Sequence, residues 1–161
     1  MAPYCERGSA EIHEVVVSED ARSRDAHMEV FRLRRDAYRY MGGDLYGALT
    51  RSVVEGALRV HVSCGWKWLL RLTFGRKDFG KGELISLLKT AGLTDDDLRP
   101  FQTANPDDIF YFLYYGKRFD VLRRLCRSAK RRSEELPETG AAKVEFHLVA
   151  PENNRIVASS I

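Results

Sequence analysis

Side chains able to do chemistry are present in this 161-residue chain, but their spacing does not gather them into a catalytic set. Paired carboxylates occur at residues 95–97 and 107–108. Both groups stand where helices are expected to start, so capping of backbone N–H groups accounts for them without catalysis. No local motif joins the serine, histidine and aspartate residues into a triad. We therefore predict that the chain is not an enzyme.

Motifs for binding metals and phosphates are also incomplete. The three cysteines are far apart and form no CxxC or CxxH unit: Cys5, Cys64 and Cys126. Only His61 lies near one of them, which is half a motif, whereas a structural zinc site needs four ligands. The glycines between 75 and 82 do not match the phosphate loop. We expect no metal and no cofactor.

The composition suits one packed domain, because a 44% hydrophobic share stands beside a 30% charged share. No apolar run approaches the roughly 18 residues that a membrane span requires. The first residues lack the pattern of a signal peptide, and the odd number of cysteines is typical of a reducing compartment. We expect a cytoplasmic protein, with the nucleus as a second compartment, and no membrane partner.

Basic residues are concentrated in one segment. Residues 117–132 contain eight basic residues and a single acid, Asp120. An aromatic run at 109–115 precedes them. Such a combination suits core packing, contact with an acidic protein surface, or stacking on bases with phosphate contacts. All three interpretations stay open at this point.

Most of the chain shows helical spacing of apolar residues. Glycines at 42–43 and at 92 mark helix ends, while Asp44 and Thr94 are suited to cap helix starts. Helices are expected at 26–41, from 45 to about 61, after Ser63, at 83–91 and from 107 onward.

The phase of the apolar pattern breaks between residues 107 and 126. Ile109, Phe112, Leu113 and Gly116 keep one helical stripe. Continuing that stripe would bury Asp120 and would leave the following leucines outside the core. We therefore predict two helices that meet near 116–119.

The two ends of the chain carry β-like patterns. Residues 143–150 alternate in polarity, residues 155–161 are a candidate partner strand, and residues 11–17 form a short β-like run. The predicted fold is mainly α, a compact antiparallel six-helix bundle with short β-like terminal segments. Its predicted divisions are an N-terminal arm at 1–25, the bundle at 26–132 and a C-terminal tail at 133–161.

The helix junction resembles a known signature. Residues 116–125, GKRFDVLRRL, resemble the R-x-D-L-L signature that opens the last helix of death-effector domains, with Val121 in place of the first leucine. Residues 83–93 resemble the fourth helix of that family, and residues 107–115 would be the fifth. The resemblance is specific over residues 83–126.

The resemblance implies a surface charge triad. Arg118 and Asp120 match the signature directly, and the third member would be Asp44 or Glu55. Such a triad would orient an interface more than it would stabilise the fold. The candidate partner-binding residues are Arg118, Asp120, Asp44, Glu55, Arg123 and Arg124.

The function that this resemblance implies is a homotypic death-effector adaptor or decoy that regulates apoptotic or immune signalling. Its partners would be death-effector-domain proteins such as death-receptor adaptors and initiator caspases, with self-association as a further mode. The alternative is a helical domain that binds nucleic acid through residues 117–132.

Overall fold

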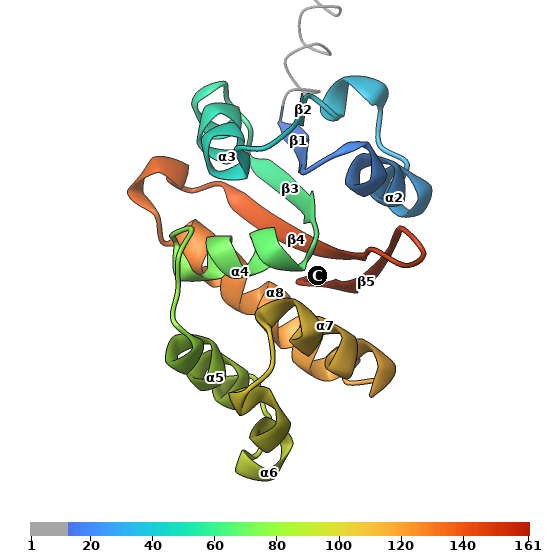
Figure 1. The fold of residues 1–161 in the computed structure, drawn as a ribbon. Coiled ribbons are helices and arrows are strands. Elements are labelled where there is room, and N and C mark those ends of the chain that lie inside the picture. The colour runs from blue at the N-terminus through green and yellow to red at the C-terminus, as the bar shows by residue number, and fades with distance from the viewer. Residues whose placement is uncertain (1–12) are drawn as a thin grey trace, which may run out of the picture.

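A computed structural model describes residues 13–161 and shows an α/β fold (Figure 1). Five strands form one mixed sheet in the order β2-β1-β3-β4-β5. Strands β1, β2, β3 and β4 run parallel to one another, and β5 runs antiparallel to β4. The strands are β1 (Glu14–Ser18), β2 (Tyr40–Met41), β3 (Arg59–Cys64), β4 (Lys143–Ala150) and β5 (Arg155–Ser159).

Helices cover both faces of this sheet. The α-helices are α2 (Ala21–Phe31), α3 (Leu45–Val54), α4 (Trp66–Phe74), α5 (Lys81–Thr90), α6 (Asp95–Leu98), α7 (Pro106–Tyr115) and α8 (Phe119–Glu134). Short 3₁₀ helices are η1 (Arg35–Ala37), η2 (Arg99–Gln102) and η3 (Pro137–Thr139). Helix α2 lies across one face and contacts β1, β3, β4 and β5. Helices α3, α4 and α8 pack on the other face, and α5 and α6 extend away from the sheet (Figure 1).

The apolar core lies between the sheet and α3, α4 and α8. Alternate strand residues such as Val15, Val60 and Phe146 point into it and are fully or almost fully buried. Helix α8 contributes a complete apolar stripe, including Leu122 and Leu125. Burial on this face therefore supplies most of the hydrophobic stabilisation of the fold.

The prediction of a mainly α six-helix bundle is wrong. The expected helix at 26–41 is instead α2, which ends at Phe31, followed by η1 and β2. The expected helix from 45 to about 61 ends at Val54, and residues 59–64 form β3 in the centre of the sheet. Gly56, with a φ of 105°, turns the chain between them, and the side chains of Val60 and Val62 suit a pleated strand.

Other local predictions are confirmed. Two helices meet near 116–119, since α7 ends at Tyr115 and α8 begins at Phe119. Asp44 caps α3, and strand β4 pairs with a strand formed by residues 155–159. Within α7 the buried aromatic residue is Phe110, whereas Phe112, assigned to the stripe, is 53% exposed.

The sheet draws strands from all three predicted divisions of the chain. Residues 1–12 of the predicted N-terminal arm, together with Cys5 and the first part of the β-like run at 11–17, lie outside the described residues. Among residues 13–161, no helix combines the length and the apolarity needed to span a membrane.

Candidate functional site

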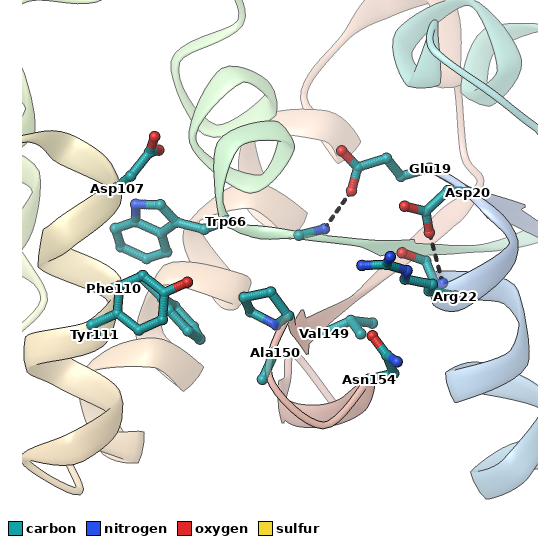
Figure 2. A pocket seen from close by; sticks show the side chains of 13 residues that line it. Glu19, Asp20, Arg22, Trp66, Asp107, Phe110, Tyr111, Val149, Ala150 and Asn154 are labelled. Carbon is teal, nitrogen blue, oxygen red and sulfur yellow. Dashed lines mark hydrogen bonds between the residues drawn. The ribbon is translucent and has the colours of Figure 1, made fainter.

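A pocket lies at the carboxyl edge of the parallel strands. Strands β1 and β3 are neighbours, but the chain leaves them in opposite directions, through α2 toward β2 and through α4 toward β4. Ligands of open α/β sheets bind at such a switch point. The pocket encloses about 260 Å³ (Figure 2). Its lining residues are Glu19, Asp20, Arg22, Ser23, Gly65, Trp66, Asp107, Phe110, Tyr111, Val149, Ala150, Pro151 and Asn154.

Two carboxylates of the carboxyl-edge pocket are fixed at helix N-termini. Asp20 follows β1 and caps α2, where its Oδ1 accepts a hydrogen bond from the backbone N–H of Ser23 at 2.9 Å. Glu19 accepts a hydrogen bond from the N–H of Gly65, at the start of α4, at 2.9 Å. The positive ends of both helices are therefore matched by carboxylates of the chain itself.

An aromatic wall stands across the pocket from these carboxylates (Figure 2). The Nε1–H of Trp66 donates to the carbonyl oxygen of Pro106 at 2.8 Å, which ties the start of α4 to the start of α7. The ring of Phe110 lies 5.8 Å from that of Trp66, and the ring of Tyr111 lies 5.5 Å from that of Phe110. Trp66 and Phe110 are buried and Tyr111 is half-buried, so the wall is rigid and part of it faces the pocket.

The turn between β4 and β5 completes the pocket. Asn154 adopts a left-handed backbone conformation with a φ of 52°, which asparagine tolerates better than most residues. Its N–H donates to the carbonyl oxygen of Ala150 at 3.0 Å and so closes the turn. Figure 2 shows Asn154 beside Val149, on the side of the pocket toward α2. The turn therefore places a neutral amide near the carboxylates.

The lining combines charge with aromatic surface. Among the described residues, it consists of three acids, one arginine, three aromatic rings, Ser23, Asn154 and small or apolar residues. Within residues 13–161, the group of metal-ligating atoms found close together consists of three histidines under α2 and shares no residue with this lining. The carboxyl-edge pocket is therefore a concave site in which acids face an aromatic wall.

The residues predicted to bind a partner lie elsewhere. Arg118 and Asp120 form an exposed ion pair at 3.2 Å at the start of α8. The third member of this charge group is Asp97, whose carboxylate lies 3.5 Å from Arg118. A hydrogen bond from Arg118 lowers the pKa of Asp120, and bonds from the Thr94 backbone and side chain are the main causes that lower the pKa of Asp97.

The structure places neither predicted acid beside Arg118. Asp44 caps α3 through a 3.0 Å bond from the N–H of Gly47, and Glu55 pairs with Arg39 at 3.6 Å. Arg123 is exposed on α8, while Arg124 donates to the carbonyl oxygen of Ala91 at 3.1 Å, just after α5.

Sequence reasoning missed the residues of the carboxyl-edge pocket. The available signal was the polar or small residues that directly follow a β-like run, Glu19 after β1 and Gly65 after β3. The sequence prediction hides that signal, because it places the end of one helix at about residue 61 and the start of another after Ser63, which leaves no strand next to β1. Comparison of the chain with protein-family models, curated proteins and solved structures gives no match.

Proposed function

We propose that this chain is a binding domain for a small aromatic ligand that carries a protonated nitrogen, and that the ligand occupies the carboxyl-edge pocket. The observation that carries the proposal is the aromatic wall of Trp66 and Tyr111 opposite the carboxylates of Glu19 and Asp20. A ring would pack on the wall while its cationic group meets the acids.

The charges around the pocket support a cation. Three carboxylates, from Glu19, Asp20 and Asp107, line the pocket beside one guanidinium group, from Arg22. One N–H at each helix N-terminus, that of Ser23 or of Gly65, already donates to a carboxylate, and the negative charge of Asp20 and Glu19 would repel an anion there. The volume of about 260 Å³ suits a compact ligand.

A matched set of probes tests the charge preference. 2-Phenylethylamine, 2-phenylethanol and 3-phenylpropionate present one ring with a positive, neutral or negative group. Backbone amide shifts of the ¹⁵N-labelled full chain would be followed during titration with each compound. We expect the tightest binding for the amine, the weakest for the carboxylate, and shifts centred on residues 19–23 and 65–66. Equal affinities for all three, or shifts elsewhere, would contradict the proposal.

Neighbouring acids on α7 supply a matched pair of variants. Asp107 lines the pocket, whereas Asp108 follows it in the same helical turn and does not. Asp107→Asn should weaken amine binding several-fold, since it removes one of the three negative charges. Asp108→Asn should leave affinity unchanged, and an equal loss in both variants would show that the effect comes from overall charge and not from the pocket.

The homotypic death-effector function and the nucleic-acid alternative stay predictions. We do not develop the first, because it depends on a six-helix scaffold and this chain has a sheet at its centre. For the second, the basic residues lie on α8 and directly before it, outside the carboxyl-edge pocket. A salt series with a nucleic acid probe would test it directly.

A further inference from the structure

The face of the sheet under α2 is unusually polar. Sheets that are mostly parallel are covered on both faces and are usually apolar on both. Here the residues that alternate with the apolar core positions include His61 and Ser63 on β3 and Glu145 and His147 on β4, all buried. Burying such groups is costly unless each one has a partner, so their presence calls for an explanation.

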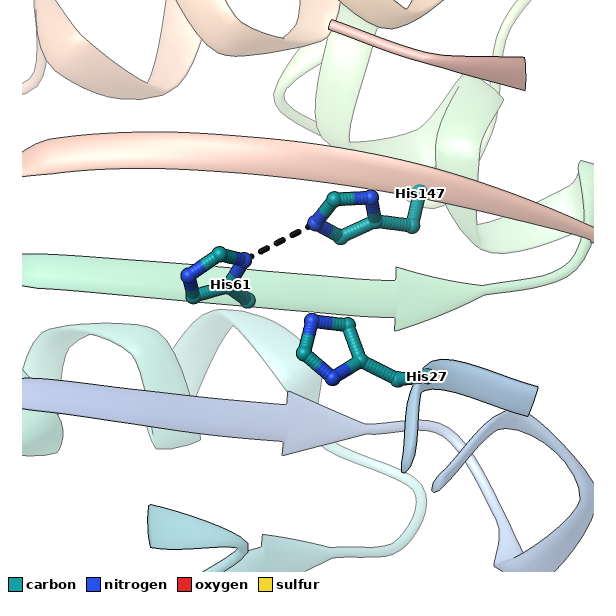
Figure 3. Close-up of side chains that lie close together, drawn as sticks. All are labelled: His27, His61 and His147. Carbon is teal, nitrogen blue, oxygen red and sulfur yellow. Dashed lines mark hydrogen bonds between the residues drawn. The ribbon is translucent and has the colours of Figure 1, made fainter. Parts of the chain in front are cut away.

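Three of the four histidines of the chain meet on this face (Figure 3). His61 and His147 project from adjacent strands, and their rings stack with centroids 5.2 Å apart. His27 descends from α2, and its ring centroid lies 4.8 Å from that of His61 and 4.9 Å from that of His147. One nitrogen from each ring lies within 4.8 Å of the other two. The fourth histidine, His13, is exposed.

The outer nitrogen of each ring has an oxygen partner. His61 Nε2 lies 2.7 Å from Glu14 Oε1, His147 Nδ1 lies 2.8 Å from Ser159 Oγ, and His27 Nδ1 lies 2.8 Å from the Tyr38 hydroxyl. A carboxylate accepts hydrogen bonds, and a hydroxyl group can rotate so that its oxygen accepts one. Each ring can therefore donate outward and keep a lone pair on its inner nitrogen, which is the arrangement found around metal-bound histidines.

Of the three inner nitrogens, two face each other and one has no partner among the described residues. His61 Nδ1 and His147 Nε2 lie 2.9 Å apart and can share one proton. Within residues 13–161, the Nε2 of His27, on a side chain with 0% exposure, has no hydrogen-bond partner. An unpartnered buried polar atom destabilises the fold, because it loses its hydrogen bond to water without gaining another. A single cation between the three rings would satisfy all three inner nitrogens at once.

The protonation state of the cluster agrees with this arrangement. Burial, together with a smaller effect of the positive charge of neighbouring histidines, lowers the pKa of His27 to about 3 and that of His147 to about 2. Burial is also the main cause that lowers the pKa of His61. The direction of all three shifts favours the neutral imidazole, which is the form that binds a metal.

We propose that His27, His61 and His147 bind a transition-metal ion of the zinc class. Three imidazole nitrogens suit zinc, copper, nickel or cobalt and do not suit magnesium or calcium, which prefer oxygen. Tetrahedral Zn–N bonds of about 2.0–2.1 Å place ligand nitrogens ~3.3 Å apart, so the rings need only small shifts from their present positions.

The position of the ion assigns it a structural role. Phe31 lies over the cluster, with its ring centroid 4.5 Å from that of His27 and 4.7 Å from that of His147. The three histidines supply three of the four ligands of a tetrahedral ion, so a water molecule must complete the set, and the aromatic ring over the cluster leaves little room for a substrate. The ion would join α2 to β3 and β4 on the face of the sheet that lacks an apolar core.

Cobalt and zinc test the proposal directly. After treatment with a chelator, the full chain would be titrated with Co²⁺ and followed by its visible absorption, and with Zn²⁺ by calorimetry and thermal unfolding. We expect one ion per chain, the intense visible bands of a tetrahedral Co²⁺ site, and a rise of several degrees in Tm. The absence of saturable binding, or a stoichiometry other than one, would overturn the proposal.

Variants locate the ion. His27→Asn should abolish saturable binding, and His13→Asn, which changes the exposed histidine, should bind like the wild type. His27→Cys should add a thiolate-to-Co²⁺ charge-transfer band in the near ultraviolet, a signal that a loss of folding cannot produce. Tyr38→Phe should weaken binding by roughly 10–100-fold, while Tyr40→Phe should not. Wild-type affinity in His27→Asn, or a His27→Cys spectrum without that band, would place the ion elsewhere.

Discussion

Ion pairs on this chain differ in their exposure to water. Their contributions to the free energy of unfolding should therefore differ. Arg118 and Asp120 are exposed, so water competes for both charges. Lys130 is half-buried and bonds Glu134 at 2.7 Å and Glu145 at 2.9 Å. Burial alone would raise the pKa of Glu145, but its hydrogen bond from Lys130 holds that pKa below the usual value.

The same substitution at both cations should therefore give different losses of stability. Lys130→Met leaves Glu145, which is 9% exposed, without its cation, and we expect a loss of about 2–4 kcal/mol in the free energy of unfolding. Arg118→Met should change it by less than about 1 kcal/mol. Urea denaturation of both variants measures the difference, and equal losses would show that burial does not set the weight of these pairs.

The described cysteines should be chemically silent in the folded protein. Cys64 and Cys126 are fully buried, and burial raises the pKa of Cys126 to about 12 and that of Cys64 well above its ordinary value. Thiol reactivity requires an accessible thiolate. In a Cys5→Ser background, we expect no reaction with a thiol reagent at mildly alkaline pH and reaction of two thiols per chain in concentrated guanidinium chloride. Rapid labelling without denaturant would show that the core opens readily.

At the scale of elements, the junction of α7 and α8 depends on one left-handed residue. The N–H of Arg118 bonds the carbonyl oxygen of Leu113 at 2.8 Å, and the N–H of Lys117 bonds that of Tyr114 at 3.1 Å. This bond pair closes the helix end, and it requires the left-handed conformation that Lys117 adopts with a φ of 57°. Glycine adopts that conformation without steric cost, whereas lysine does not.

Lys117→Gly should therefore stabilise the protein by up to about 1 kcal/mol. Lys117→Ala is the matched control, since it removes the same charged chain but keeps the Cβ atom, and it should give no gain. Thermal and urea unfolding of the two variants would separate backbone strain from charge. A gain in both variants would instead attribute the effect to the cationic side chain.

Sequence reasoning succeeded where the signal was local. The break near 116–119 was visible because one apolar stripe ended and another began out of phase. It failed at residues 45–61, where the apolar stripe of Leu45, Leu49 and Val53 continues as far as Val60. Short apolar runs fit a helix or a strand about equally well. The sequence signal for the change from α3 to β3 was Gly56, which adopts a positive φ in the structure.

The candidate sites were less accessible to sequence reasoning, because both are assembled by strand pairing. The carboxyl-edge pocket combines residues after β1, β3 and β4 with residues of α7, and the histidine cluster joins His27 to His147 across most of the chain. No short motif links these positions. The alternation of residues 143–150 did place His147 opposite the apolar face, but a single histidine at such a position has no special meaning until its neighbours are known.

At the scale of the whole molecule, different interactions attach the helices to the two faces of the sheet. Helix α8 covers one face and buries six side chains, mostly apolar, including Val121, Leu122 and Leu125. Helix α2 covers the other face and buries only Ser23, Ala26 and His27. Apolar burial contributes about 25 cal/mol per Å², and α2 has little of it. Its attachment depends mainly on the polar contacts under it.

Hydrogen exchange should reveal this asymmetry within one molecule. In metal-free protein we expect the amides of residues 21–31 to exchange faster than those of residues 119–134, because local opening of α2 exposes less apolar surface to water. Zn²⁺ should then slow exchange in α2 of the wild type, leave α8 unchanged, and have no effect in His27→Asn. Both helices pack on the same sheet in the same solvent, so they can be compared directly. Equal protection of their amides without metal would mean that the polar contacts under α2 hold that helix as firmly as the apolar core holds α8.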